Sequence, residues 1–106
     1  MRVRKTSVYK KWIKGLRDSR ARYRILTRIK RLEEGNPGDC YPIGDGLSEM
    51  RIHYGPGYRV YFKAPTGCQD TGQEIVILLC GGDKSTQQQD VARAKQIAAL
   101  PLEEEE

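Results

Sequence analysis

The sequence is poor in the residues that build metal centres and disulfide frameworks. It has one histidine and three cysteines, Cys40, Cys68 and Cys80, which are widely spaced and form no C-x-x-C pair. An odd number of separated cysteines supports neither a zinc site nor a disulfide framework. We therefore expect no metal and no cofactor, and we expect a reducing cytoplasm to be the compartment.

Long apolar runs are also missing. The amino terminus, "MRVRKTSVYKKW", does not lead into an apolar segment long enough for a signal peptide or a membrane span. The 106 residues, of which 38% are hydrophobic and 31% charged, fit one soluble domain. We expect this domain to occupy residues 1–100, and we expect the glutamate-rich residues 101–106 to form a disordered tail.

Acidic residues are scarce in the first third of the chain. Residues 1–34 contain thirteen lysines and arginines against three acidic residues, and the whole chain has a net charge of +5 although its last four residues are glutamates. Such an excess favours a polyanionic partner, either nucleic acid or an acidic protein segment. It is equally compatible with a surface whose charge serves only solubility, so charge alone does not decide between them.

Apolar periodicity predicts three helices. Residues 8–16 place apolar side chains three and four positions apart, as on one helical face, and a second helix follows to about Glu34. Arg24, Arg28 and Arg31 lie off the apolar stripe of that second helix. A third helix is predicted after Thr86. The apolar stripe of the second helix consists of Ala21, Ile25, Ile29 and Leu32. The apolar face of the third helix consists of Val91, Ala94, Ile97 and Ala98.

Between the second and third helices the apolar period changes from helical to alternating. The segments "SEMRIHY" and "YRVYFK" alternate on either side of Gly-Pro-Gly, which predicts a β-hairpin. The segment "EIVILLC" is apolar on both faces and predicts a third strand, with residues 64–73 as the intervening loop. The fold class is therefore α+β: an N-terminal helical hairpin packed on a small twisted antiparallel sheet, with a C-terminal helix. All three helices are expected on one sheet face.

The outward face of the predicted hairpin gathers polar side chains. If Met50 and Val60 face the helices, the opposite face displays Glu49, Arg51, His53, Arg59 and Tyr61, and Lys84 arrives at its edge. Cleavage of RNA without a metal needs a base for the 2′-hydroxyl, cations for the phosphorane and an acid for the 5′-oxygen. Arg51 and Arg59 suit the cationic role, and His53 suits either proton transfer.

The remaining candidates have less specific patterns. Lys84 suits a proton transfer if neighbouring cations destabilise its ammonium form. Tyr61 is a candidate to orient the phosphate or to stack on a base, and Arg24, Arg28 and Arg31 are candidates to bind RNA. The competing interpretation is a solvated polar hairpin face and a solvated basic helix, with no chemistry at either.

The strings "RIHYGPGYRVYF" and "LLCGGDKSTQ", with "RYRILTRIKRLEEGNPGD" upstream, resemble the HigB-like branch of the RelE/ParE toxin superfamily, the addiction-module killer proteins. The resemblance covers residues from about 8 to 99. It implies a toxin of a bacterial type II toxin-antitoxin system, an endoribonuclease (mRNA interferase) that enters the ribosomal A site and cuts messenger RNA without a metal. By position it implies catalytic roles for Arg51, His53, Arg59 and Lys84.

The resemblance also implies partners. These are a cognate HigA-like antitoxin with a helix-turn-helix DNA-binding domain, messenger RNA, ribosomal RNA, and operator DNA only through the antitoxin; no membrane is implied. Two departures leave the acid and base open. The last helix begins "QQQDVARA" where several relatives have tyrosine or histidine, and Glu49 stands where some have a basic residue. They also keep open the superfamily's other branch, which poisons DNA gyrase on the same fold.

Overall fold

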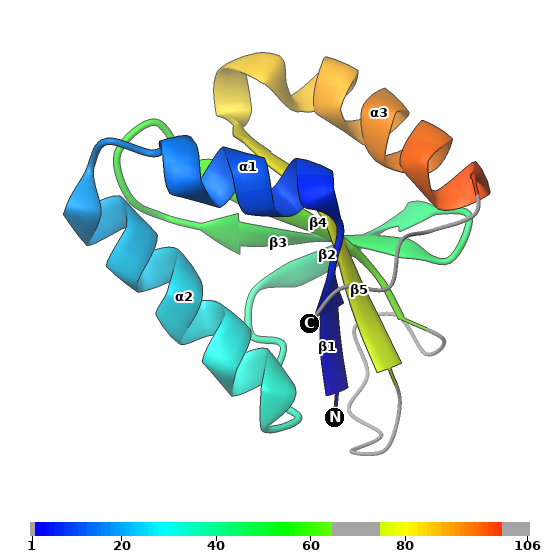
Figure 1. The fold of residues 1–106 in the computed structure, drawn as a ribbon, viewed down its shortest axis with the longest axis horizontal. Helices are drawn as coiled ribbons and strands as arrows, with labels where there is room; N and C mark the ends of the chain where they lie inside the picture. Colours follow the sequence, from blue (N-terminus) through cyan, green and yellow to red (C-terminus); the bar gives the residue numbers. More distant parts are fainter. Residues whose placement is uncertain (1, 65–74, 101–106) are drawn as a thin grey trace.

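The computed structural model describes residues 2–64 and 75–100, so the predicted tail over 101–106, Cys68 and nearly all of the predicted loop lie outside the described residues. The helices and strands follow one another as drawn in Figure 1. They are β1 (Arg2–Lys5), α1 (Ser7–Gly15), α2 (Ser19–Glu33), β2 (Cys40–Gly44), β3 (Leu47–Ile52), β4 (Tyr58–Lys63), β5 (Ile75–Asp83), the 3₁₀ turn η1 (Lys84–Thr86) and α3 (Gln87–Ala99).

The described strands form one five-stranded sheet in the order β1-β5-β4-β3-β2. Strands β2 to β5 pair antiparallel, whereas β1 runs parallel to β5. The α+β class is confirmed, but the prediction of a purely antiparallel sheet is wrong. Strand β1 has only four residues, and three of them are cationic, so no apolar alternation marks it. Strand β2 contains Pro42 and Gly44, which are typical of loops and are tolerated here at a sheet edge.

Helices cover both faces of the sheet, so the prediction that all three lie on one face is wrong. Two neighbouring glycines of β5 show the division. A Cβ atom at Gly81 would overlap the ring of Trp12 on α1, whereas one at Gly82 would overlap the carboxylate of Asp90 on α3. Successive strand residues point to opposite faces. The core under α3 is therefore separate from the one under α1 and α2; its buried members are Leu47, Tyr61, Leu79, Cys80 and Ala94.

Side-chain caps position the helical hairpin. The Asp18 carboxylate accepts hydrogen bonds from the backbone of Arg20 at 2.9 Å and of Ala21 at 3.2 Å, which satisfies two amides at the start of α2. Its other oxygen accepts a hydrogen bond from the Tyr54 hydroxyl at 3.1 Å. Gly35, at φ 90°, ends α2 in the left-handed conformation that glycine adopts without strain. The cap of α2 thus also connects this helix to the turn between β3 and β4.

The cysteines differ from expectation. Cys80 is buried and free, but Cys40, at the start of β2, is disulfide-bonded. The expectation of a reducing compartment therefore loses the support that unpaired cysteines gave it. No helix among the described residues is long and apolar enough to span a membrane.

The contact between Gly81 and Trp12 makes the fold sensitive to one methyl group. We expect Gly81→Ala to lower the free energy of unfolding by about 1–3 kcal/mol, because the added Cβ must displace an indole ring in a packed core. Gly15→Ala is the matched control. No atom lies within 4 Å of its added Cβ, and a helical alanine should raise stability by about 0.5–1 kcal/mol. Urea unfolding measures both, and equal stabilities of the two variants would contradict the packing.

Candidate functional site

The predicted polar residues of the hairpin lie on one sheet face, as their alternation indicates. Arg51 stands directly opposite Arg59, and Glu49 opposite Tyr61. That face is not open to solvent, however, because α3 packs on it. Glu49 is 1% exposed, Tyr61 0% and Arg59 8%. The prediction that Tyr61 contacts a base is therefore wrong for this arrangement, since its ring is fully enclosed and its hydroxyl has no hydrogen-bond partner among the residues that the structure describes.

Glu49 is the centre of the site. One carboxylate oxygen accepts a hydrogen bond from Arg51 Nε at 2.7 Å, and the other accepts one from Gln87 Nε2 at 2.8 Å. Arg59 Nε lies 3.7 Å from that second oxygen. The hydrogen bond from Arg51 to Glu49 also raises the pKa of the Arg51 guanidinium. One buried carboxylate therefore pairs with both arginines, and the cluster is less cationic than the sequence predicts.

Arg59 and Lys84 meet beside the hairpin turn. Arg59 Nη1 donates a hydrogen bond to the Gly57 carbonyl at 3.2 Å. A Cβ atom on Gly57 would lie 3.7 Å from Arg59 Nη1 and 3.5 Å from Lys84 Cβ. Gly57 has φ 82°, a backbone conformation that favours glycine. Lys84 itself is exposed at the start of η1. The structure thus brings Arg51 and Arg59 together at Glu49, and Arg59 and Lys84 together at the turn.

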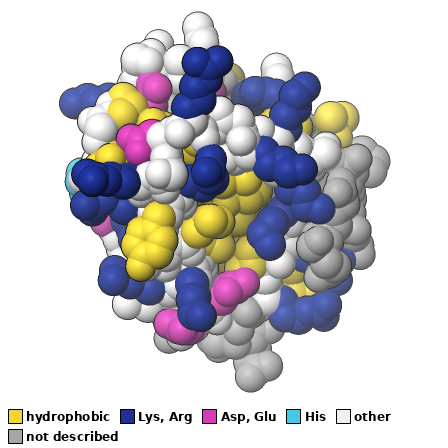
Figure 2. All heavy atoms as spheres, turned by 60° about the vertical axis from the view of Figure 1, so that its left-hand side comes forward, with side chains coloured by type: hydrophobic (Ala, Val, Ile, Leu, Met, Phe, Trp, Pro, Cys, Tyr) yellow, Lys and Arg dark blue, Asp and Glu magenta, His cyan; other side chains and the backbone are white. Residues whose placement is uncertain are grey.

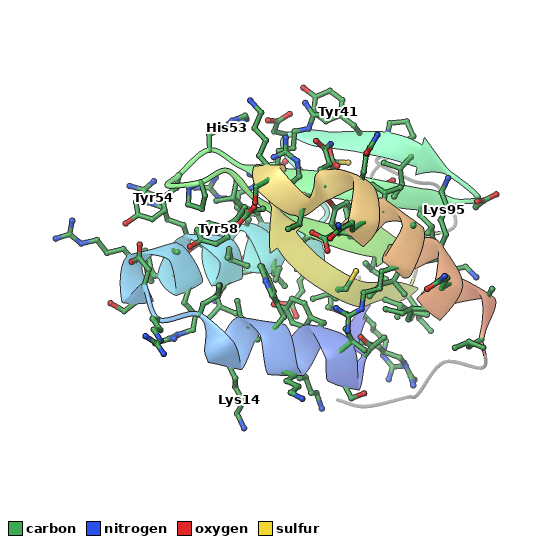
Figure 3. The ribbon with its side chains drawn as sticks, turned by 90° about the horizontal axis from the view of Figure 1, so that it is seen from above. Lys14, Tyr41, His53, Tyr54, Tyr58 and Lys95 are labelled. Carbon is green, nitrogen blue, oxygen red and sulfur yellow. The ribbon has the colours of Figure 1, made fainter. Side chains whose placement is uncertain are left out.

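His53 stands at the end of β3 with a carboxylate of its own. Its side chain is 76% exposed, and its Nε2 pairs with Asp39 Oδ2. Hydrogen bonding to His53, with a smaller contribution from the Tyr41 hydroxyl, holds the pKa of Asp39 below its ordinary value. The Arg51 guanidinium carbon lies 3.8 Å from the centre of the Tyr41 ring. Figure 3 shows His53 and Tyr41 on the same side of the molecule.

The three carboxylate and aromatic residues that complete the site, Glu49, Asp39 and Tyr41, were not assigned by sequence reasoning. Glu49 was placed on the outward face of the hairpin and noted as a departure from the resembled family, but it was given no role. Asp39 and Tyr41 belong to the segment in and before β2, which has no recognisable strand pattern. The sequence offered one local signal for these residues, because each lies next to a segment that contains glycine or proline. The pairing of each residue with a cation is visible only in the structure.

The predicted RNA-binding arginines of α2 divide into two kinds. Arg24 and Arg31 are exposed and line an open groove of about 820 Å³, together with Arg20 and with His53 from the end of β3. Arg28 is half-buried, and its guanidinium donates to three backbone carbonyls, those of Arg51 at 2.6 Å, Asp39 at 3.1 Å and Pro37 at 3.2 Å. Arg28 therefore connects α2 to β3 and to the segment before β2. Most of its N–H donors are already used, so few are left to bind RNA.

Comparison with known proteins identifies one relative. This chain is 45% identical over 98 residues to a protein of Haemophilus influenzae described as an uncharacterized protein, and the match covers 92% of this chain and 93% of that one. The chain belongs to the family of that Haemophilus protein. No family model matches the chain, and no solved structure matches it. No activity is named for this relative, so a functional proposal rests on the site itself and on the sequence motifs.

The His53–Asp39 pair has a measurable signature. A carboxyl group whose folded pKa is lowered contributes stability that is present above its ordinary pKa of about 3.9 and is lost as the pH falls through the folded pKa. We therefore expect the Asp39 carboxyl carbon to titrate below the ordinary aspartate range in an NMR titration. His53→Ala should move that titration upward, because the largest cause of the shift is removed. An unchanged Asp39 titration in His53→Ala would contradict the pairing.

Proposed function

We propose that the protein is a toxin of a bacterial type II toxin-antitoxin system, which inhibits translation by metal-independent, ribosome-dependent cleavage of messenger RNA. The proposal is supported by the resemblance of its motifs to the HigB-like branch of the RelE/ParE superfamily. Its main structural support is the grouping of Arg51, Arg59 and Lys84 at one end of the central strands, with His53 directly after the last residue of β3. Cations beside two exposed titratable groups suit a phosphodiester.

The chemistry would divide among these residues as follows. The guanidinium of Arg51 is partly exposed, so it would contact the scissile phosphate. Arg59 is buried, so it would add positive electrostatic potential without touching the substrate. A ring that is held through Nε2 by Asp39 presents its Nδ1 to a substrate, so His53 would exchange one proton there. Lys84, at the start of η1 directly after β5, would serve the second proton transfer.

Glu49 would act as a positioning residue. It accepts from Arg51 and lies beside Arg59, so both guanidinium groups are fixed before a substrate arrives. Fixed dipoles and charges need no reorganisation when charge develops in the transition state. The cost is a weaker local field, because the carboxylate offsets one positive charge. Attraction of RNA over longer distances would then come from the exposed arginines of α2, Arg24 and Arg31, rather than from the cluster.

A cognate HigA-like antitoxin is the partner that we propose, and α1 offers a surface that fits it. An apolar recess of about 200 Å³ between α1 and α2 is lined by Ile13 and Leu26 and bordered by Lys5, Lys10 and Lys14. Figure 2 shows lysine and arginine side chains around exposed hydrophobic ones on this side of the molecule. Such a surface complements an acidic amphipathic segment. Operator DNA would be bound through the antitoxin.

A second candidate function is a poison of DNA gyrase that cleaves nothing. The pairing of Arg51 and Arg59 with one carboxylate favours it, because a protein-binding surface does not need free guanidinium groups. The exposed His53–Asp39 pair favours the nuclease instead, because a binding surface has no use for a titratable ring held in a fixed orientation. The two functions predict different damage in the cell: the nuclease cuts messenger RNA, whereas the gyrase poison causes DNA breaks.

The nuclease is tested by mapping messenger RNA ends after tightly controlled expression, while DNA breaks are followed in parallel. We expect cuts confined to translated messages, and we expect His53→Gln and Lys84→Ala each to lower the cutting rate by about 10²–10⁴-fold, the usual contribution of a general acid or base. Both side chains are exposed, so the variants should fold. Lys63→Ala, which removes one exposed positive charge at the far end of β4, is the matched control and should cut normally.

Four outcomes would count against this assignment. DNA breaks with intact messages would replace the nuclease by the gyrase poison. Normal cutting by His53→Gln would remove His53 from the reaction, and normal cutting by Lys84→Ala would remove Lys84. A folded Arg51→Ala variant that still cuts at the normal rate would show that the scissile phosphate lies elsewhere.

The α2 groove makes a separate prediction about RNA affinity. We expect Arg24→Ala and Arg31→Ala each to weaken binding to single-stranded RNA and to reduce the slope of log affinity against log salt by about 0.7, the value for one lost phosphate contact. Fluorescence anisotropy at several salt concentrations measures this slope. Lys63→Ala should leave it unchanged. A slope that falls equally in all three variants would mean that only net charge matters and that the groove binds nothing in particular.

A further inference from the structure

Tyr41 is an exposed aromatic side chain in an unusual setting. It lies on the edge strand β2, directly opposite Glu49, so it points to the sheet face that carries the arginine cluster. It is 43% exposed. Surface tyrosines are common, but this ring has a guanidinium stacked on it, since Arg51 Cζ lies 3.8 Å from the ring centre. The open part of the ring therefore adjoins the group that would hold the scissile phosphate.

The ring is also held in place. Its hydroxyl contributes to lowering the pKa of Asp39, the carboxylate that pairs with His53, and its face is fixed by Arg51, which is itself bonded to Glu49. A ring that is immobilised before binding loses little conformational entropy when a ligand stacks on it. Stacking of one base on an aromatic side chain contributes substantially to single-strand binding, whatever the base, because every base has a flat π face.

From this arrangement we propose that Tyr41, backed by Arg51, is the stacking platform for the base next to the scissile phosphate, and that the substrate at this site is therefore single-stranded RNA. The inference rests on the proposed nuclease function and assigns Tyr41 the role that the sequence suggested for the buried Tyr61. Bases inside a duplex are stacked on their neighbours and do not reach such a ring, whereas bases of a single strand splay out. A phosphate on Arg51 and a base on Tyr41 would be contacts of one nucleotide.

The experiment compares two probes of equal length that cannot be cleaved at a 2′-hydroxyl. One is a fluorescein-labelled single-stranded 2′-O-methyl octanucleotide, and the other is the same backbone with abasic sugars. Both bind the full-length protein at low salt through phosphate contacts, and only the first can stack. We expect Tyr41→Ala to weaken binding of the base-bearing probe by about 5- to 150-fold and to change binding of the abasic probe by less than about twofold. Tyr41→Phe should restore binding of the base-bearing probe.

Each alternative result has a definite meaning. Equal losses for both probes would overturn the proposal, because Tyr41 would then act only by holding Arg51. Equal binding of the two probes by the unaltered protein, or no binding of either, would overturn it as well. A base-bearing duplex whose binding depends equally on Tyr41 would overturn the single-strand assignment.

Failure of this inference is distinguishable from failure of the nuclease. The probes report binding without cleavage, so Tyr41-dependent stacking with no cutting of cellular messages would leave the platform in place and remove the nuclease. Normal cutting by Tyr41→Ala at unchanged positions, with no base-dependent loss of binding, would remove the platform and leave the nuclease.

Discussion

The buried carboxylate of Glu49 is the interaction on which the site depends. A charge that is 1% exposed must be paired, because an isolated buried carboxylate costs several kcal/mol. Here the partners come from three elements: Arg51 of β3, Arg59 of β4 and Gln87 of α3. The same pairing that satisfies the carboxylate therefore fixes two guanidinium groups and seats the first turn of α3, and with it the preceding turn that carries Lys84.

The sequence predicted the elements better than their arrangement. Both N-terminal helices, the hairpin, β5 and α3 follow from periodicity, because each carries a regular apolar pattern. Strand β1 has one apolar residue among three cations, and β2 contains Pro42, so neither has a pattern to recognise. Both form because a neighbouring strand offers an unpaired edge, which is a tertiary cause. The position of α3 was misjudged for a related reason: β5 is apolar on both faces, and that pattern does not tell which helix covers which face.

The candidate site shows the same division. The cations Arg51, Arg59 and Lys84 and the ring of His53 were found from residue type and strand alternation. The pairing of His53 with Asp39 was not predicted, because it spans fourteen residues, and the contact of Gln87 with Glu49 was not predicted, because it spans thirty-eight. Alternation places a side chain on a face but does not give the residue that packs over it. Tyr61 was expected to be exposed for that reason, and α3 encloses it.

The two basic regions of the molecule differ in how their charge is balanced. Around Glu49 and Asp39 most cationic groups have a carboxylate partner, so the cluster has a weak field at long range but a fixed geometry at short range. On α2, Arg24 and Arg31 are exposed beside an open groove, so they attract a polyanion from a distance but fix no geometry. Long-range attraction of RNA is therefore a property of the α2 groove, and positioning of RNA is a property of the cluster around Glu49 and Asp39. The two surfaces meet at His53, which lines the groove and pairs with Asp39. An RNA strand drawn to α2 would reach the cluster at the residue best suited to proton transfer, whereas a protein partner that binds α2 would cover the approach without touching the buried arginines.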